Sequence, residues 1–336
     1  MKSTFYTAAL AAMIASPGNA ASIPQMTPRN EVFKRASDLS LPGLSTNCIS
    51  IGFLPSEGET NQAPRYTMDQ INSKLGARAA TYGWYAQIKG STFDGSQLLA
   101  VKDDVVKSGA VFVASVMPSV NFNQITPEVA KQVAAVMKKF TDEGVPVWLR
   151  FAHEMNWYVK DGTYHGDVAG FQTAWKNIYN ANCKGNDKVK CFWSPNQGAA
   201  KDLQQWWPGK EYVDIVGIDC YPKADDDTSK ISLFDKFYGD FYNTFSKAND
   251  LPFAIGETGA GTGKKDAWLK TVVSKEVKAK YPNYVSMSWF EYNKEADFRV
   301  VMTDDKTLAN TKKTLLAGGN ETCGKGKGSG NAMVPA

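Results

Sequence analysis

Residues 146–158 read PVWLRFAHEMNWY and combine an apolar run with three ionisable side chains, Arg150, His153 and Glu154. A short, nearly continuous apolar run is typical of a parallel β-strand that is covered on both faces. Charged side chains are rarely buried without a partner or a function. The stretch therefore predicts a buried strand that ends in a functional site.

Seven other runs in the chain share this apolar, β-rich character. They are CISIGFLP from residue 48, RAATYGWYAQ from residue 78, AVFVASVMP from residue 110, VKCFWSPN from residue 189, DIVGIDCYP from residue 214, PFAIGETG from residue 252 and VSMSWFEYN from residue 285. Eight such runs alternating with helical patterns predict an α/β fold, a single-domain (β/α)8 barrel. A doubly wound open sheet is the structural alternative, but it usually carries a Gly-rich phosphate loop after an early strand, and the sequence shows none.

Two of the helical patterns are well marked. Residues 126–144 begin with Thr126-Pro127, a capping residue followed by a first-turn proline, and end at Gly144. Their apolar positions recur every three or four residues, as on one face of a helix. Residues 167–182 repeat the pattern, so both segments are expected to cover the sheet.

The two ends of the chain differ from the barrel segment at 46–318. Residues 1–20 have a lysine, an apolar stretch and a small-residue end, which is typical of a secretory signal peptide. Residues 21–45 are expected to be a propeptide or linker, and residues 319–336 a flexible tail with a glycosylation sequon at Asn320. The protein is therefore expected to be secreted, with no membrane-spanning segment.

The formal net charge is only +4 over 336 residues, and no basic block interleaves with aromatic residues. A nucleic-acid partner is therefore not expected, and the protein is expected to be a monomer. Disulfides are common in secreted proteins. Cys183 and Cys191 flank a short polar loop and are expected to pair, Cys48 and Cys323 are expected to join the two ends of the barrel, and Cys220 is expected to be a buried free thiol.

Two glutamates close opposite strands of the predicted barrel. Glu154 ends the fourth run and Glu257 ends the seventh, so their side chains are expected to face each other at the mouth. Two facing carboxyl groups suit glycoside cleavage, in which one donates a proton and the other acts as nucleophile or base. His153 does not belong to a zinc HExxH motif, because the second histidine is missing. It is expected to hold the substrate or Glu154, and no metal or cofactor is expected.

The sequence as a whole resembles glycoside hydrolase family 26, a retaining family dominated by β-mannanases. The resemblance rests on RFAHEMNWY, FWSPNQG, YVDIVGIDCYP, FAIGETG and ADFRVV, and it spans roughly residues 46–318. It implies that Glu154 is the acid/base, Glu257 the nucleophile and His153 a contact of the sugar before the cleaved bond. It also implies that Tyr221 hydrogen-bonds the nucleophile and that Trp289 forms the floor under the reacting sugar. Trp193, Asn196, Trp157, Trp84 and Arg150 complete the expected substrate-binding set.

The expected substrate is a β-linked polysaccharide, with mannan first because it is the family's commonest substrate. Mixed-linkage β-glucan and β-1,3-xylan are alternatives within the family, and a carbohydrate-binding barrel that has lost catalysis is an alternative outside enzymes. Trp157 directly follows the His-Glu-Met-Asn motif, where the family usually has glycine. Substrate specificity is therefore expected to differ at this position.

Overall fold

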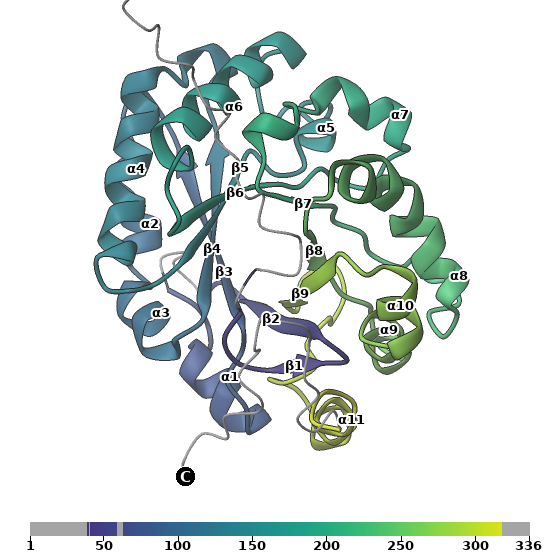
Figure 1. Cartoon of the computed structure of the whole chain (residues 1–336). Helices are drawn as coiled ribbons and strands as arrows, with labels where there is room; N and C mark the ends of the chain where they lie inside the picture. Colours follow the sequence, from purple (N-terminus) through teal and green to yellow (C-terminus); the bar gives the residue numbers. More distant parts are fainter. Residues whose placement is uncertain (1–38, 40, 59–62, 318–336) are drawn as a thin grey trace, which may run out of the picture. The chain divides into compact units, whose positions relative to one another are not determined.

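Eight parallel strands, β2 to β9, close into a barrel in the computed structural model, which describes residues 39, 41–58 and 63–317 (Figure 1). The strands are β2 (Ile49–Pro55), β3 (Thr81–Ile88), β4 (Val111–Pro118), β5 (Val147–Phe151), β6 (Val189–Trp193), β7 (Ile215–Gly217), β8 (Phe253–Thr258) and β9 (Tyr284–Glu291). Each pairs in parallel with the next, and β9 pairs with β2, which closes the barrel. A two-residue strand, β1 (Ser45–Thr46), pairs antiparallel with β2. All eight predicted strands are present, and the (β/α)8 barrel is confirmed.

Helices connect the strands on the outside of the barrel. The α-helices are α1 (Met68–Leu75), α2 (Ser96–Leu99), α3 (Lys102–Ser108), α4 (Pro127–Thr141), α5 (Met155–Tyr158), α6 (Val168–Asn182), α7 (Ala200–Leu203), α8 (Ile231–Phe234), α9 (Lys265–Val272), α10 (Lys275–Lys280) and α11 (Asp305–Leu315). Short 3-10 helices are η2 (Phe122–Gln124), η3 (Gln204–Trp206), η4 (Lys210–Tyr212) and η7 (Lys247–Asn249), and η5 (Asp235–Gly239) and η6 (Tyr242–Ser246) are π-helical turns after α8.

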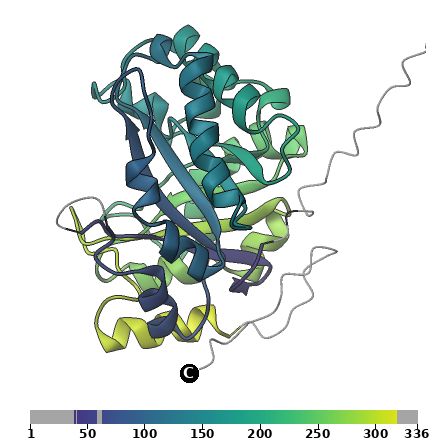
Figure 2. The same cartoon turned by 90° about the vertical axis from the view of Figure 1, so that its left-hand side faces the viewer.

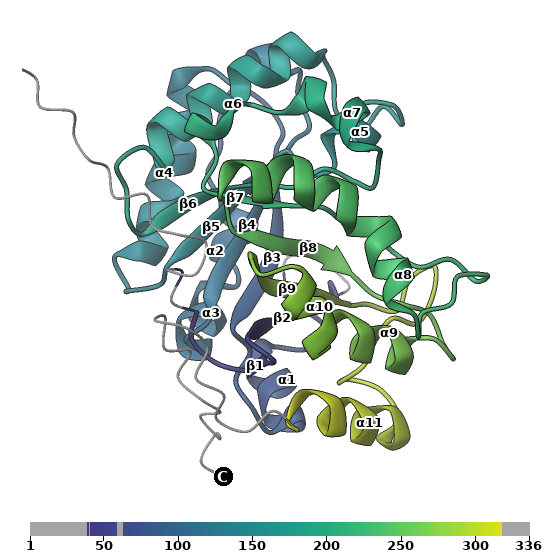
Figure 3. The same cartoon turned by 45° about the vertical axis from the view of Figure 1, so that its right-hand side comes forward.

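The two helices expected from the sequence are α4 and α6, which lie side by side (Figures 1 and 3). Thr126 caps α4 by accepting a hydrogen bond from the Val129 N–H, and Asp167 caps α6 by accepting one from the Gly170 N–H. At the other end of the sequence, α11 lies beside α1 (Figures 2 and 3), and the Lys74 ammonium donates to the Thr303 carbonyl, 3.1 Å away. Within the described residues, the last helix thus lies next to the first α-helix.

Side chains alternate between the two faces of each strand, and this alternation positions the site. In β3, the Tyr82 hydroxyl reaches Asp104 of α3 and the Trp84 indole N–H reaches the Gln97 carbonyl of α2, so both side chains face the helices. Tyr85, one residue later, points into the barrel. Whether a strand residue can contribute to the site therefore depends on which of the two faces its side chain occupies.

Several expectations about the chain outside the site can be compared with the structure. The Cys183–Cys191 disulfide is present with Cα atoms 5.8 Å apart, and Cys220 is a buried free thiol, as predicted. Cys323 and Asn320 lie outside the described residues, as do the predicted signal peptide and tail, so these features stay predictions. Within the part of the chain that is described, no helix has the length and apolar character needed to cross a membrane.

Candidate active site

Glu154 follows β5 in a tight turn that directs its side chain into the site. Ala152 and Glu154 both have positive φ, at 46° and 54°, although neither is glycine. Such conformations cost about 1–3 kcal/mol each and are concentrated at functional sites. The Glu154 N–H donates to the Ser194 carbonyl beyond the end of β6, 2.8 Å away, which anchors the turn to the neighbouring strand.

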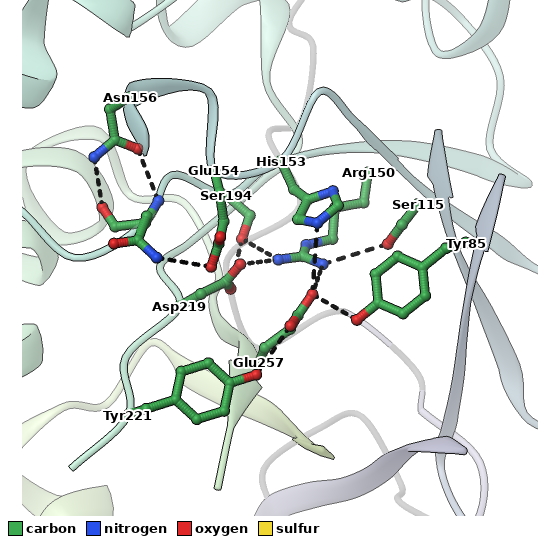
Figure 4. A network of polar contacts seen from close by, with 11 residues as sticks. Tyr85, Ser115, Arg150, His153, Glu154, Asn156, Ser194, Asp219, Tyr221 and Glu257 are labelled. Atoms are coloured by element: carbon green, nitrogen blue, oxygen red, sulfur yellow. Dashed lines mark hydrogen bonds and ion pairs between the residues drawn. The ribbon is translucent and has the colours of Figure 1, made fainter. Parts of the chain in front are cut away.

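Glu257 lies within β8, and its carboxylate is held by three hydrogen-bond donors (Figure 4). The Arg150 guanidinium and the Tyr85 hydroxyl donate to Oε1 at 2.6 and 2.7 Å, and the Tyr221 hydroxyl donates to Oε2 at 2.9 Å. The predicted hydrogen bond from Tyr221 is confirmed. Burial alone would raise the pKa of Glu257, but the charge of Arg150 and these hydrogen bonds lower it to about 2. The carboxylate is therefore ionised at neutral pH.

The pKa of Glu154 is shifted in the opposite direction. Burial, and second the negative charge of Glu257, raise its pKa to about 7. The Asn196 side-chain amide donates to Glu154 Oε1 at 2.8 Å. Asn156 fixes Asn196 in turn, because it donates to the Asn196 carbonyl at 2.9 Å and accepts from the Asn196 N–H at 2.8 Å. Asn196 therefore orients Glu154.

Arg150 was expected to bind substrate, but its side chain is 0% exposed, and that prediction is wrong. The guanidinium is enclosed by protein groups and pairs with both Glu257 and Asp219. It also donates to the hydroxyls of Ser194 and Ser115 at 3.1 and 3.3 Å. Arg150 therefore positions the Glu257 and Asp219 carboxylates.

Asp219, at the end of β7, was not predicted as a site residue, although its position after an apolar run was visible in the sequence. Its carboxylate accepts from the Ser194 hydroxyl at 2.9 Å. Burial raises the pKa of Asp219, while Arg150 opposes this rise. Three buried carboxyl groups thus lie near one guanidinium, which pairs with only two of them, and this imbalance of charge favours keeping a proton in the cluster.

His153 is buried beside Glu257, with its Nε2 atom 3.7 Å from Glu257 Oε1. Its ring packs against Tyr85 and Tyr158, with ring centroids 5.6 Å away in both cases. Burial, and then the charge of Arg150, lower its pKa to about 3, so the imidazole is neutral. Its ring nitrogens are suited to hydrogen bonding rather than to charge pairing.

Three of the predicted substrate-binding tryptophans lie in the protein core instead. Trp84, Trp193 and Trp289 are almost fully buried, and the indole N–H groups of Trp84 and Trp289 donate to the Gln97 and Phe298 carbonyls. They lie at the strand positions whose side chains point toward the surrounding helices, and their rings are packed in the hydrophobic core. The prediction that they line the mouth is wrong for that reason.

The aromatic residues that lie near Glu257 include Tyr85 and Phe290, the sequence neighbours of Trp84 and Trp289. They form a cluster with Leu54, composed of Tyr85, Tyr221, Phe290, Tyr292 and Phe298. The rings of Phe290 and Tyr292 stack at 3.9 Å, and the ring of Tyr221 lies 5.6 Å from that of Phe298. Trp157 belongs to helix α5, which begins directly after Glu154. Its side chain is 52% exposed, and it is the one exposed large hydrophobic side chain among the described residues. It keeps a ring surface that a sugar can contact.

A (β/α)8 barrel with one carboxyl group of raised pKa and one of lowered pKa, at the ends of its fourth and seventh parallel strands, has the architecture of a barrel glycosidase. Residues 101–314 match the sequence profile of glycosyl hydrolase family 26, and the chain belongs to that family.

Relatives of known name agree with this family. The chain is 27% identical to mannan endo-1,4-beta-mannosidase of Bacillus subtilis (strain 168) over 164 residues, which cover 46% of this chain and 41% of the relative. It is 26% identical to endoglucanase H of Acetivibrio thermocellus over 238 residues, which cover 64% of this chain and 25% of the relative. The chain thus spans less than half the length of these relatives.

Solved structures share the fold at low identity. A family 26 β-mannanase from Bacteroides ovatus superposes with a TM-score of 0.58 at 17% identity, covering 84% of this chain and 90% of that one. The Bacillus subtilis mannanase BCman superposes with a TM-score of 0.56 at 18% identity, covering 79% of this chain and 84% of that one. These similarities support the barrel.

Proposed function

We propose that this protein is a secreted, retaining glycoside hydrolase that cleaves β-1,4-mannan within the chain. The observation that carries the proposal is that the pKa values of two buried carboxyl groups are shifted in opposite directions. The pKa of Glu154 is raised to about 7 and that of Glu257 is lowered to about 2. Near neutral pH, one group can donate a proton while the other can attack, which is the division of labour that glycoside cleavage needs.

The reaction proceeds in two displacements. Glu257 attacks the anomeric carbon while Glu154 transfers its proton to the departing glycosidic oxygen, which leaves a glycosyl ester on Glu257. Esterification removes the negative charge of Glu257, and this charge is one of the causes of the raised pKa of Glu154. Glu154 therefore becomes more acidic and, once ionised, accepts a proton from water as the water attacks the anomeric carbon. Glu257 leaves as a carboxylate, and the sugar keeps its β configuration.

Mannan is the favoured substrate because three of the curated relatives are mannan endo-1,4-beta-mannosidases. A β-glucan is the second candidate, because endoglucanase H of Acetivibrio thermocellus matches the largest share of this chain among the curated relatives. Secretion rests on the signal-peptide pattern in residues 1–20.

A reducing-sugar assay on mannan, mixed-linkage β-glucan and xylans tests the substrate. Wild-type protein should release sugar fastest from mannan, and Glu154→Gln should lose this activity. Glu143→Gln is the matched control, because Glu143 is exposed and pairs with Lys102 at the surface. Binding to a β-glycan without product release by the wild type would favour the carbohydrate-binding alternative.

Azide distinguishes the roles of the two glutamates. With an aryl β-glycoside whose leaving group needs no proton, Glu154→Ala should form a β-glycosyl azide, because azide attacks the intermediate on Glu257. Glu257→Ala should form an α-glycosyl azide by direct displacement. If Glu154→Ala gave the α-glycosyl azide and Glu257→Ala the β-glycosyl azide, Glu154 would be the nucleophile and Glu257 the acid/base. Hydrolysis with inversion by the wild type would refute the double displacement.

A further inference from the structure

Tyr85 contacts the Glu257 carboxylate from β3, on the opposite side from Tyr221 (Figure 4). Its hydroxyl lies 2.7 Å from Oε1, the same oxygen that Arg150 contacts at 2.6 Å. Oε2 has the Tyr221 hydroxyl, at 2.9 Å, as its donor. The two oxygens of Glu257 are thus unequally held.

We infer that Tyr85 is a positioning residue that reserves Oε2 of Glu257 for attack and helps Glu257 to leave in the second displacement. Oε1 accepts two hydrogen bonds, one of them from a buried guanidinium, and hydrogen bonds to charged groups are strong. An attack through Oε1 would have to weaken both. An attack through Oε2 weakens only the bond from Tyr221, so this oxygen forms the ester, and Oε1 becomes the ester carbonyl. This inference rests on the proposed double displacement.

The side chain of Tyr85 is suited to act as a permanent donor. Burial, and second the charge of Glu257, raise the pKa of its hydroxyl well above the usual range, so it stays protonated. Its ring is fixed against His153, with centroids 5.6 Å apart, and against the aromatic cluster that includes Phe290. The hydroxyl is therefore held in place throughout the reaction.

The hydrogen bond from Tyr85 acts differently on the two steps. In the first, the C1–Oε2 bond forms, the bond to the leaving oxygen breaks, and Glu257 loses its charge, so the bond to Oε1 weakens. In the second, water bonds to C1, its proton passes to Glu154, and the C1–Oε2 electron pair returns to Glu257. Charge then grows on the carboxylate and the bond from Tyr85 strengthens. Tyr85 therefore favours the second step over the first.

Tyr85→Phe tests this role with a dinitrophenyl β-glycoside of the sugar that the wild type prefers, for which the second step limits turnover. Loss of a hydrogen bond to a charged group should lower kcat by about tenfold. KM should fall with it, and the steady-state release of dinitrophenol that follows the burst should slow by the same factor, because the intermediate lasts longer. The acid limb of kcat/KM should move to higher pH, because Glu257 loses a donor to its ionised form.

Tyr82→Phe is the matched control, because Tyr82 lies on the same strand and donates to Asp104 on the helix-facing side. It should leave the burst, the pH profile and kcat unchanged. If Tyr85→Phe does not fold, Tyr85→Leu lacks the same donor and takes its place.

Two failures are distinguishable. A Tyr85 variant that loses the same factor on polysaccharide and aryl glycoside, with KM and the pH profile unchanged, would show a merely structural role and overturn the inference. A wild type that hydrolyses no β-glycan, or inverts configuration, would instead refute the proposed function.

Discussion

Replacing Glu154 with glutamine should stabilise the folded protein at alkaline pH while removing its proposed activity. Glu154 has a pKa of about 7 in the folded protein, against 4.5 for an unperturbed glutamate. The difference corresponds to about 3 kcal/mol, at about 1.4 kcal/mol for each tenfold change in proton affinity. Below pH 4.5 the carboxyl is protonated in both folded and unfolded chains, and burial carries no charge penalty. As the pH rises through 7, the folded protein must also ionise Glu154, and the full penalty appears.

Glutamine cannot ionise, and its side-chain oxygen can keep the hydrogen bond from Asn196. The free energy of unfolding of Glu154→Gln should therefore exceed that of the wild type by up to about 3 kcal/mol at pH 8. The two proteins should be nearly equal at pH 4.5. Urea unfolding at a series of pH values measures both differences.

Glu143→Gln is again the control, since it removes an exposed carboxylate, and the change should stay below about 1 kcal/mol at every pH. A difference between Glu154→Gln and the wild type that is the same at pH 4.5 and pH 8 would refute the reasoning. So would a variant that is less stable than the wild type at pH 8. Either result would mean that burial does not hold a proton on Glu154.

Three other changes have expected outcomes. Arg150→Met should lower the free energy of unfolding by roughly 3–5 kcal/mol at neutral pH, because Glu257 loses its buried partner; an unchanged melting temperature would contradict this. Trp157→Ala should raise KM for polysaccharide while changing the free energy of unfolding by less than about 0.5 kcal/mol, because its ring is exposed; an unchanged KM would remove Trp157 from the site. Replacing both Cys183 and Cys191 with serine should lower the free energy of unfolding by roughly 2–3 kcal/mol in urea, because the disulfide closes a loop with a sequence separation of 8. The replacement should leave kcat unchanged, and a lowered kcat would show that the disulfide also shapes the site.

The barrel could be predicted from the sequence because its signals are local. Each strand is a short apolar run, and helices α4 and α6 carry caps and a 3.6-residue period. The positions of Glu154 and Glu257 followed from the fold, since the carboxyl ends of parallel strands in a barrel meet at one face.

The face of the strand on which each side chain lies could not be predicted in the same way. When both faces of a strand are buried, apolar residues occupy both, and nothing in the run shows which face meets the helices. The run therefore does not show whether Trp84 or Tyr85 belongs to the site, and in the structure Tyr85 is the residue that faces the barrel. For Trp289 it was the family resemblance that implied a place in the site, whereas its neighbour Phe290 belongs to the aromatic cluster near Glu257.

Long-range pairing was also hidden from the sequence. Arg150 and Asp219 are 69 positions apart, and only the folded barrel brings them together in one buried cluster. Asp219 did have a visible signal, since it is an acidic residue at the end of an apolar run. A single carboxylate at a strand end does not show what it contacts.

The central claim is that Glu257 forms a covalent bond with the sugar. Incubating the wild type with a 2-deoxy-2-fluoro-β-glycosyl fluoride of its preferred sugar should trap this intermediate, because fluorine slows its hydrolysis. Mass spectrometry of the digested protein should then find one sugar on the peptide that contains Glu257. The label should be absent from Glu257→Gln and present in Tyr82→Phe. A sugar attached at Glu154, or a wild type that turns over the substrate with inversion and without labelling, would contradict the account.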